Sequence, residues 1–245
     1  MINRLKKFIE RLTGYWIWKR IHLPTGTDLE VDLEKINLSG SKIVFDVGAN
    51  IGQTALYYNK IFKSAHIYSF EPVKKSFEEL LYRTKNLPKI QAENIGFGEK
   101  DEKIEITLDI NPTSTSNSLK PELMNNDQNG GKEVLKICKI DSFCKERNID
   151  NIDFLKIDTE GWEIQTLLGA EKLLSERNIK AILCEVGFTK ENRRNTPFQD
   201  LNSFMADKGY FFYGLYDISL IQLKSGGHYG NALFVDNKYL MKSIH

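Results

Sequence analysis

The sequence of 245 residues lacks the features of a membrane-spanning or disulfide-bonded protein. No apolar run approaches the roughly 20 residues that a transmembrane helix needs, and the first residues contain no continuous apolar core of a signal peptide. The three cysteines, Cys138, Cys144 and Cys184, are scattered, odd in number and form no C-x-x-C pair. A structural zinc site is therefore not expected, and the reducing cytoplasm is the expected compartment.

An excess of charge of either sign is also missing. The net charge is +1 and the pI is about 7.6, so the composition indicates no nucleic-acid partner. Hydrophobic residues make up 41% and charged residues 27% of the chain, which suffices for one large α/β domain. The charge is nevertheless uneven: residues 1–22 contain six basic residues and one acidic residue, a net of +5, which leaves −4 for the rest.

This basic segment, residues 1–22, predicts an amphipathic helix. Its apolar stripe consists of Leu5, Phe8, Ile9 and Leu12, and Trp16 and Trp18 follow. Such a helix could contact an anionic membrane at the inner face of the cell, or a lipid-linked substrate. It could instead pack on the domain or on a second subunit of a homo-oligomer, and we favour packing. We expect residues 1–40 to form an N-terminal basic helix and extension, and residues 41–245 to form the main domain.

The stretch at residues 42–54, KIVFDVGANIGQT, predicts a buried strand, a tight turn and the start of a helix. Its apolar run is β-branched and aromatic, as in buried parallel strands, and Asp46 stands at the end of that run. The turn contains Gly48, Asn50 and Gly52, and glycines let backbone amides approach a ligand closely. A strand, a glycine turn and a helix N-terminus commonly hold a nucleotide-like ligand.

Acidic side chains at the predicted strand ends indicate which ligand this is. A dinucleotide fingerprint needs G-x-G-x-x-G, but Asn50 replaces the middle glycine and Asp46 would repel a phosphate. Asp46 suits an amine, and Glu71, after the next predicted strand, can accept both hydroxyls of a ribose. S-adenosylmethionine carries these groups, whereas a turn that only connects two elements would not explain both acids. The expected cofactor-binding residues are Asp46, Gly48, Asn50, Gly52, Gln53, Thr54, Glu71, Pro72, Asn94, Gly96 and Asp158.

A second acidic group follows the predicted strand at residues 152–157. Asp158, Glu160 and Glu163 come at its carboxyl end, the edge at which open parallel sheets bind ligands. Glu185 lies near the end of the next apolar strand, where a carboxylate is costly to bury unless it binds something. The candidates for a catalytic base are Asp158, Glu160, Glu185 and His228, although a lone loop histidine is often only solvated. A divalent metal held by Asp158 and Glu185 is the alternative.

The acceptor is expected to contact residues near this acidic group. The loop at residues 111–118 is rich in hydroxyl groups and could either line the active site or serve as a flexible connection. The expected substrate-binding residues are Asn117, Ser118, Glu160, Trp162 and Glu163.

Apolar strands alternate with helical patterns along the rest of the chain, which predicts an α/β fold. Further strands are expected at residues 90–95, 103–108, 133–140, 180–186, 210–216 and 231–235, and helices at residues 53–62, 73–86, 141–147, 163–176 and 197–208.

The motifs FDVGANIGQ, SFEP and LKIDTEGWE occur in this order and resemble the FkbM family of S-adenosylmethionine-dependent methyltransferases over residues 42–236. The resemblance implies a Rossmann-like class I methyltransferase fold: a seven-stranded sheet with helices on both faces and an antiparallel last strand. By position, the glycine turn matches the family's donor loop, Glu71 its ribose acid and residues 158–163 its acidic signature, while Ser118-Leu119 resembles a Ser-Leu feature. The resemblance does not identify the base.

The function that follows is an S-adenosylmethionine-dependent O-methyltransferase. The resemblance implies an acceptor hydroxyl on a sugar, a glycan precursor or a similar small molecule. A nicotinamide-dependent oxidoreductase would need the missing middle glycine. A nucleic-acid methyltransferase is disfavoured because DTEG stands where an Asn-Pro-Pro-Tyr-like stretch would support it. A non-sugar acceptor, or a donor-binding protein without activity, remains as the alternative.

Overall fold

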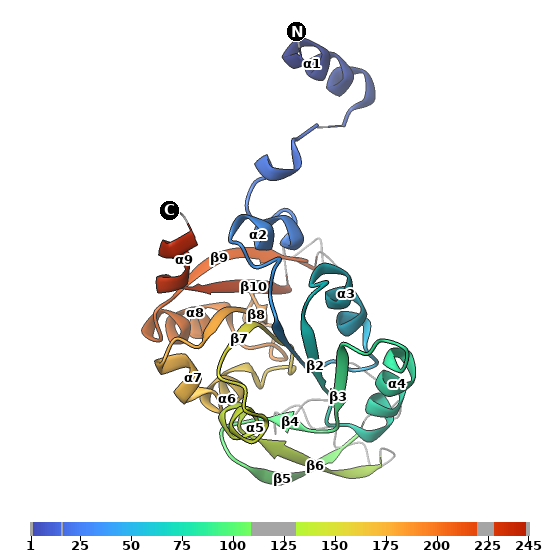
Figure 1. Cartoon of the computed structure of the whole chain (residues 1–245), viewed down its shortest axis with the longest axis vertical. Helices are drawn as coiled ribbons and strands as arrows, with labels where there is room; N and C mark the ends of the chain where they lie inside the picture. The colour runs from blue at the N-terminus through green and yellow to red at the C-terminus, as the bar shows by residue number, and fades with distance from the viewer. Residues whose placement is uncertain (1, 16, 109–130, 220–227, 244–245) are drawn as a thin grey trace.

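The computed structural model describes residues 2–15, 17–108, 131–219 and 228–243 (Figure 1). Within these residues the chain forms an α/β body, from which the first helix projects. None of the described helices combines the length and the apolar character that crossing a bilayer requires.

Seven of the strands in the described residues form the main sheet, with the order β3-β2-β1-β7-β8-β10-β9. These strands are β1 (Ile43–Val47), β2 (His66–Phe70), β3 (Ile90–Glu93), β7 (Ile152–Ile157), β8 (Ile179–Gly187), β9 (Tyr210–Tyr216) and β10 (Tyr229–Asp236). The pairs from β3 to β8 are parallel, and β10 pairs antiparallel with both β8 and β9. The class I methyltransferase topology with an antiparallel last strand is thereby confirmed.

Helices cover both faces of this sheet (Figure 1). On each face, apolar side chains of helices and strands pack into one cluster. One face carries α5 (Ile140–Arg147), α6 (Glu163–Leu168), α7 (Glu171–Ser175) and α8 (Phe198–Asp207). The other carries α2 (Leu29–Lys35), α3 (Gln53–Ile61), α4 (Lys74–Thr84) and α9 (Asn237–Ser243). The central strands β1, β7 and β8 are buried from both sides, which explains their nearly continuous apolar sequences.

A second, three-stranded sheet was not expected from the sequence. Its order is β4 (Gly96–Phe97), β6 (Lys132–Cys138) and β5 (Glu102–Thr107). It encloses a small apolar cluster to which Val73 and the partly buried Trp162 contribute. The exposed alternating strand predicted at residues 103–108 and the strand predicted at residues 133–140 correspond to β5 and β6, the two long strands of this sheet. Val73 and Trp162, from the loops that follow β2 and β7, pack against it.

The single helix predicted for residues 163–176 is wrong, because the structure divides it into α6 and α7 at Gly169. A Cβ atom at Gly169 would lie 2.2 Å from the carbonyl oxygen of Gly98, so only glycine allows the two backbones to approach this closely. The new helix start is then capped by Asp141, whose carboxylate accepts hydrogen bonds from the amides of Lys172 (2.8 Å) and Leu173 (3.2 Å).

Helix α2 belongs to the packed body, although it lies within residues 1–40. Leu29 and Leu33 are buried in the same cluster as residues of the sheet. The carboxylate of Asp32 is fully buried and accepts hydrogen bonds from the amide of Gly26 (2.7 Å), the hydroxyl of Tyr216 (2.8 Å) and Lys35 Nζ (2.8 Å). The part of the predicted extension that stands away from the core is therefore α1 (Ile2–Thr13) and the short segment after it, which contains the 3₁₀ turn η1 (Arg20–His22).

We expect the substitution Tyr216→Phe to lower the free energy of unfolding by about 1–3 kcal/mol, because it leaves a buried carboxylate oxygen of Asp32 without one of its donors. Urea unfolding followed by circular dichroism measures this. The exposed Tyr82→Phe variant is the control and should change stability by less than about 0.5 kcal/mol. Equal effects of both substitutions would contradict a stabilising role of the α2–β9 contact.

Candidate active site

The carboxyl ends of β1 and β7 meet at the centre of the sheet and bring their loops into contact. The amide of Asp158 donates to the carbonyl of Val47 (3.0 Å), which continues the pairing of the two strands. Gly48 follows directly, with φ +78°, and a Cβ atom there would lie 1.8 Å from the carbonyl oxygen of Asp158. The glycine therefore permits the two chain segments to touch where the strands end.

Asp46 lies fully buried in β1 beside this contact. Its Oδ2 atom accepts a hydrogen bond from Thr54 Oγ1 (2.7 Å), and Oδ1 has no hydrogen-bond partner among the described residues. Burial raises the pKa of Asp46, although the charge of Lys156 and the hydrogen bond from Thr54 oppose this rise. A buried carboxylate oxygen without a donor favours a ligand that brings a cation or an N–H group.

The loop after β1 takes the sharp turn that the sequence predicted. Gly48, Asn50 and Gly52 all have positive φ angles, of +78°, +47° and +93°, and Gly52 precedes the first residue of α3. Asn50 Oδ1 is buried and has no hydrogen-bond partner among the described residues. The loop that follows β1 therefore presents a second unused acceptor, in addition to that of Asp46.

Glu71 follows β2 and connects the loops after β1 and β2. Its Oε2 atom accepts from the amide of Asn50 and its Oε1 atom from the amide of Val73, both at 2.9 Å. Burial raises the pKa of Glu71 to about 7, against the opposing effect of these two hydrogen bonds. Each oxygen can still accept a further hydrogen bond, so the carboxylate can both hold the loops and accept the hydroxyls of a ribose.

These residues fit S-adenosylmethionine as a cofactor. The unused Oδ1 atoms of Asp46 and Asn50 offer acceptors for its amino group, and Glu71 offers acceptors for its ribose. Asp46, Asn50 and Glu71 would therefore hold the cofactor.

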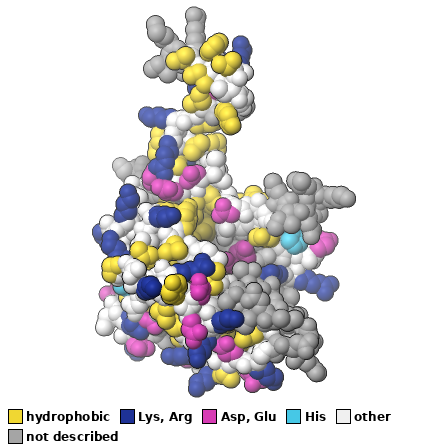
Figure 2. Space-filling view, turned by 90° about the vertical axis from the view of Figure 1, so that its right-hand side faces the viewer, with side chains coloured by type: hydrophobic (Ala, Val, Ile, Leu, Met, Phe, Trp, Pro, Cys, Tyr) yellow, Lys and Arg dark blue, Asp and Glu magenta, His cyan; other side chains and the backbone are white. Residues whose placement is uncertain are grey.

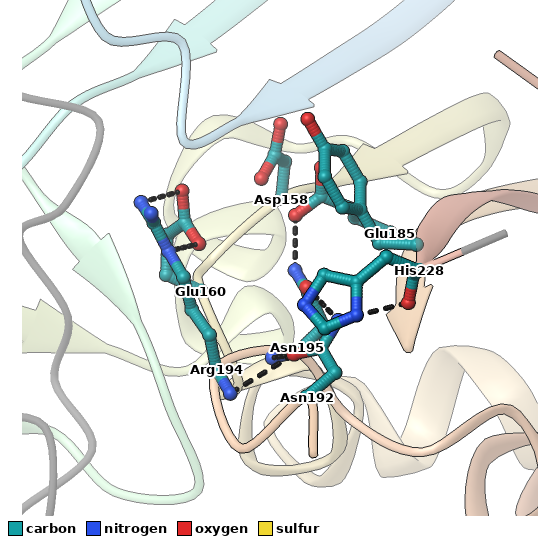
Figure 3. A pocket seen from close by; sticks show the side chains of 8 residues that line it. Asp158, Glu160, Glu185, Asn192, Arg194, Asn195 and His228 are labelled. Atoms are coloured by element: carbon teal, nitrogen blue, oxygen red, sulfur yellow. Dashed lines mark hydrogen bonds and ion pairs between the residues drawn. The ribbon is translucent and has the colours of Figure 1, made fainter. Parts of the chain in front are cut away.

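A pocket of roughly 330 Å³ lies at the carboxyl ends of β7 and β8 (Figure 3). Its lining residues are Asp158, Glu160, Glu185, Asn192, Arg194, Asn195, His228 and Tyr229. The four residues that the sequence singled out as catalytic candidates therefore surround one cavity. His228 reaches it because β10 runs antiparallel, with Tyr229 opposite Gly187 at the end of β8.

Lys156, the penultimate residue of β7, supplies a buried cation next to this pocket. Its Nζ atom lies 2.8 Å from Asp158 Oδ2, and the lysine side chain is only 4% exposed. Burial by itself would lower the pKa of Lys156, but the attraction of Asp158 and Asp46, with a smaller part from Glu185, raises it. The lysine is therefore charged, and it pairs with the carboxylate of Asp158.

The other two carboxylates of the pocket have different partners. Glu160 accepts hydrogen bonds from Arg194 at both oxygens, with Arg194 Nη2 at 2.6 Å from Oε1. Burial, with a contribution from Asp158, raises the pKa of Glu160 to about 7. Glu185 Oε2 accepts from Asn195 Nδ2, and burial together with the charges of Asp158 and Glu160 raises the pKa of Glu185 to about 9. Glu185 is thus protonated at neutral pH.

His228 is held by its backbone and by one ring nitrogen. Its carbonyl accepts from Asn192 Nδ2 (3.0 Å) and from the amide of Phe188 (3.1 Å). Its Nδ1 atom lies 3.3 Å from Thr189 Oγ1. The ring is therefore fixed at the pocket wall (Figure 3), rather than free in solvent as a loop histidine often is.

Several other predicted site residues have supporting contacts. Thr54 bonds Asp46, and Asn94 Nδ2 donates to the carbonyls of Glu71 and Pro72, both at 2.9 Å. Gly96 lies in β4, where a Cβ atom would be 2.8 Å from Ile137 and 3.3 Å from Pro72. Gln53 is exposed at the first position of α3.

Glu163 and Trp162 lie away from the pocket lining. Glu163 is fully buried and accepts hydrogen bonds from the amides of Thr159 (3.0 Å) and Gly161 (3.1 Å) and from the hydroxyl of Thr196. These contacts give it a role in shaping the loop after β7. Trp162 packs against the small sheet, with its buried Nε1 atom unpartnered among the described residues. Asn117 and Ser118 lie outside the described residues.

Sequence reasoning missed Lys156 and the loop between β8 and α8. Lys156 interrupts the apolar run Phe154-Leu155-Lys156-Ile157, and a lysine inside a buried strand is a signal that a charged partner lies nearby. Asn192, Arg194 and Asn195 come from a polar segment without any strand or helix pattern. Their grouping depends on the buried side-chain bond from Asn192 Nδ2 to Asn195 Oδ1 (2.8 Å), which no spacing rule reveals.

We expect the pH dependence of stability to identify Glu71 as a buried acid. Since its pKa is raised from 4.5 to about 7, the folded state binds more protons than the unfolded state between these values, and folding weakens as pH rises through this window. Without cofactor, Glu71→Gln should therefore gain stability relative to the unsubstituted protein, by up to roughly 3 kcal/mol between about pH 4.5 and about pH 8.

Urea unfolding of both proteins at the two pH values measures the shift. The exposed Glu78→Gln is the matched control and should show no such change with pH. A stability difference between Glu71→Gln and the unsubstituted protein that stays constant over the window would contradict the assignment.

Comparison with known proteins identifies a family. The family model described as the methyltransferase FkbM domain matches residues 46–212. A curated relative, Methyltransferase 1 of Beauveria bassiana (strain ARSEF 2860), is 25% identical over 144 residues, which are 52% of this chain and 58% of the relative. The chain therefore spans less than two thirds of that relative's length.

Two solved structures are similar at low identity. TrmK of M. capricolum, in complex with S-adenosyl-homocysteine, is 14% identical with a TM-score of 0.47, over 86% of this chain and 70% of that one. An rRNA methylase from Streptococcus thermophilus is 11% identical with a TM-score of 0.47, over 91% of this chain and 99% of that one.

The family match extends over more than half of the chain. It includes the glycine loop after β1, the acid after β2 and the acidic segment after β7, so it confirms the resemblance seen in the sequence and, with it, S-adenosylmethionine as the cofactor. The chain belongs to the methyltransferase FkbM domain family.

Proposed function

We propose that this protein is an O-methyltransferase that transfers the methyl group of S-adenosylmethionine to a hydroxyl of a sugar, a glycan precursor or a similar small hydroxylated molecule. The observation that carries the acceptor class is the pocket lining, since each of its lining side chains bears a polar group. Carboxylates, amides, an imidazole and a phenol can donate to or accept from several hydroxyl groups at once. The volume of roughly 330 Å³ is at the small end of ligand pockets and suits one small acceptor or the end of a longer one.

The cofactor, when bound, supplies a methyl group on a positively charged sulfur. The residues of this chain then need to place the acceptor oxygen in line with that group and to remove its proton, and positioning accounts for most of the rate gain. Asp158 suits the positioning role. Lys156 donates a hydrogen bond to Oδ2 of Asp158, and Oδ1 can accept a hydrogen bond from an acceptor hydroxyl.

His228 suits the role of general base best among the four candidates. Both oxygens of Glu160 are engaged by Arg194, and Glu185 already carries a proton at neutral pH. An imidazole exchanges protons near neutral pH more readily than any other ordinary side chain. In the tautomer in which Nδ1–H donates to Thr189 Oγ1, Nε2 of His228 has its lone pair available to take the proton of the acceptor hydroxyl.

A metal ion is the second candidate for activating the hydroxyl. Oxygen atoms of Asp158, Glu160 and Glu185 lie within 4.8 Å of one another, a spacing that a divalent cation could bridge. However, Lys156 and Arg194 already compensate two of these three carboxylates. We therefore favour a reaction that depends on His228 rather than on a metal.

The substitution His228→Gln should lower kcat by roughly 10²–10⁴-fold while the dissociation constant for the cofactor stays within about threefold. Asp46→Asn should instead weaken cofactor binding by roughly tenfold or more, because the buried acceptor for the cofactor's amine loses its charge. Calorimetric titration with S-adenosylmethionine, and S-adenosylhomocysteine release with a panel of free and nucleotide-linked sugars, separate the two effects. His22→Gln, an exposed histidine in η1, is the matched control.

Full activity of His228→Gln would contradict the base assignment. Undiminished cofactor binding by Asp46→Asn would contradict the donor site. Absence of methyl transfer to every hydroxylated acceptor, with cofactor binding intact, would favour a non-sugar acceptor or a binding protein without activity.

The substitution Glu185→Gln distinguishes the base from the metal. Glu185 is protonated at neutral pH, so the amide of the variant can accept a hydrogen bond from Asn195 and donate one into the pocket, as the acid does. The kcat of Glu185→Gln should therefore fall by less than about fivefold. A metal ligand would not tolerate this change: activity would fall by roughly 10²-fold or more, chelator would abolish the turnover of the unsubstituted protein, and Mg²⁺ would restore it. Turnover with and without chelator measures both outcomes.

A further inference from the structure

Helix α1 projects from the α/β body with its apolar side chains in solvent (Figures 1 and 2). Phe8 is 62% exposed and Leu12 75% exposed, and Leu5 is similarly accessible. This does not agree with the expectation that the helix packs on its own domain. An apolar stripe of this kind is unusual on a free surface and indicates a surface that is covered in use.

The segment after α1 continues the same surface. Tyr15, Trp18 and Ile21 are all exposed. Glu10 Oε1 accepts a hydrogen bond from the amide of Ile17 (3.0 Å), and Lys6 Nζ lies 5.2 Å from the centre of the Trp18 ring. These contacts fold the segment back toward the helix, so helix and aromatic residues form one unit. We call residues 5–15 and 17–21 the apolar arm.

The charge of this unit is strongly of one sign. Residues 1–22 have a net charge of +5, while the whole chain has only +1. Lys7 and Arg11 on α1 are exposed, and Glu10 is the single acidic residue of the segment. Exposed apolar and aromatic side chains flanked by basic residues match a partner that has an apolar interior and a negatively charged outer layer.

We propose that the apolar arm docks on an anionic lipid bilayer, with α1 lying in the plane of the headgroups and its apolar stripe in the acyl boundary. The 12-residue helix is too short to span a bilayer and long enough to lie on one. Tyr15 and Trp18 have the amphipathic rings that favour the membrane–water interface. Each basic residue near the surface strengthens binding to anionic lipid by roughly fivefold.

A second copy of the chain is the other occupant that such a stripe could have. Each arm contains five basic residues and one acidic residue, so two arms packed face to face would bring two segments of +4 together, and Glu10 alone offers an opposite charge in each. A short helix with like charges along its edges is a poor dimerisation element. Charge complementarity therefore favours an anionic bilayer over self-association.

The test is flotation of the full chain with vesicles of pure phosphatidylcholine and with vesicles that contain about one third phosphatidylglycerol. We expect binding to the anionic vesicles only, at least roughly tenfold weaker at high salt. The double variants Phe8→Glu/Leu12→Glu and Lys7→Glu/Arg11→Glu should each weaken binding by roughly tenfold or more, with unchanged thermal unfolding and cofactor affinity.

Matched controls come from α4, which is part of the body. Lys74→Glu/Lys75→Glu changes the net charge by the same amount, and Tyr82→Glu removes an exposed aromatic residue; both should bind vesicles as the unsubstituted chain does. The proposal is overturned if the chain does not float with anionic vesicles, or if the α4 variants lose binding as the arm variants do. It is also overturned if light scattering shows a dimer in solution that Phe8→Glu/Leu12→Glu dissociates, since a second copy then covers the stripe.

Discussion

The candidate site depends on the attraction between the buried ammonium group of Lys156 and the carboxylates around it. This buried ammonium group is bonded to Asp158 and attracts Asp46 and Glu185, so it compensates acids at the ends of three neighbouring strands, β1, β7 and β8. Without a cation at this point, ionised carboxylates would be buried together with nothing to offset their repulsion, which is strongly unfavourable. The cofactor side and the acceptor side of the site therefore share one electrostatic centre.

Around this centre, acids of the same chemical type acquire different roles from their partners. Asp158 is paired with Lys156, Glu185 holds a proton at neutral pH, and Glu163 fixes the loop that carries Asp158 and Glu160. Such sorting of neighbouring carboxylates by burial, hydrogen bonds and nearby charge is how a site can offer acceptors and donors at one pH. The same arrangement makes the site sensitive to the loss of any single partner.

The sequence allowed the main sheet to be predicted well, because its strands are long apolar runs and the acids that matter stand at their ends. Asp46, Glu71, Asp158 and Glu185 could be found from that position alone. The division of α6 from α7 could not, since it depends on how Gly169 meets Gly98, a contact between distant segments. The polar loop with Asn192 and Asn195 was missed for the same reason: its order comes from side-chain bonds formed only in the folded state.

The place of β10 has a consequence for how the protein is made. This strand is inserted between β8 and β9, and its first residues lie beside the end of β8. His228 therefore joins Asp158 in the pocket lining only after nearly the whole chain is available. The donor loop depends only on earlier strands, because it follows β1 and contacts Asp158 after β7 through Gly48. The acceptor pocket must wait for a long-range strand pairing, which is a slow kind of contact to form. Completing the acceptor pocket therefore requires the last strand of the sheet, whereas the donor loop requires only strands that precede it in the chain.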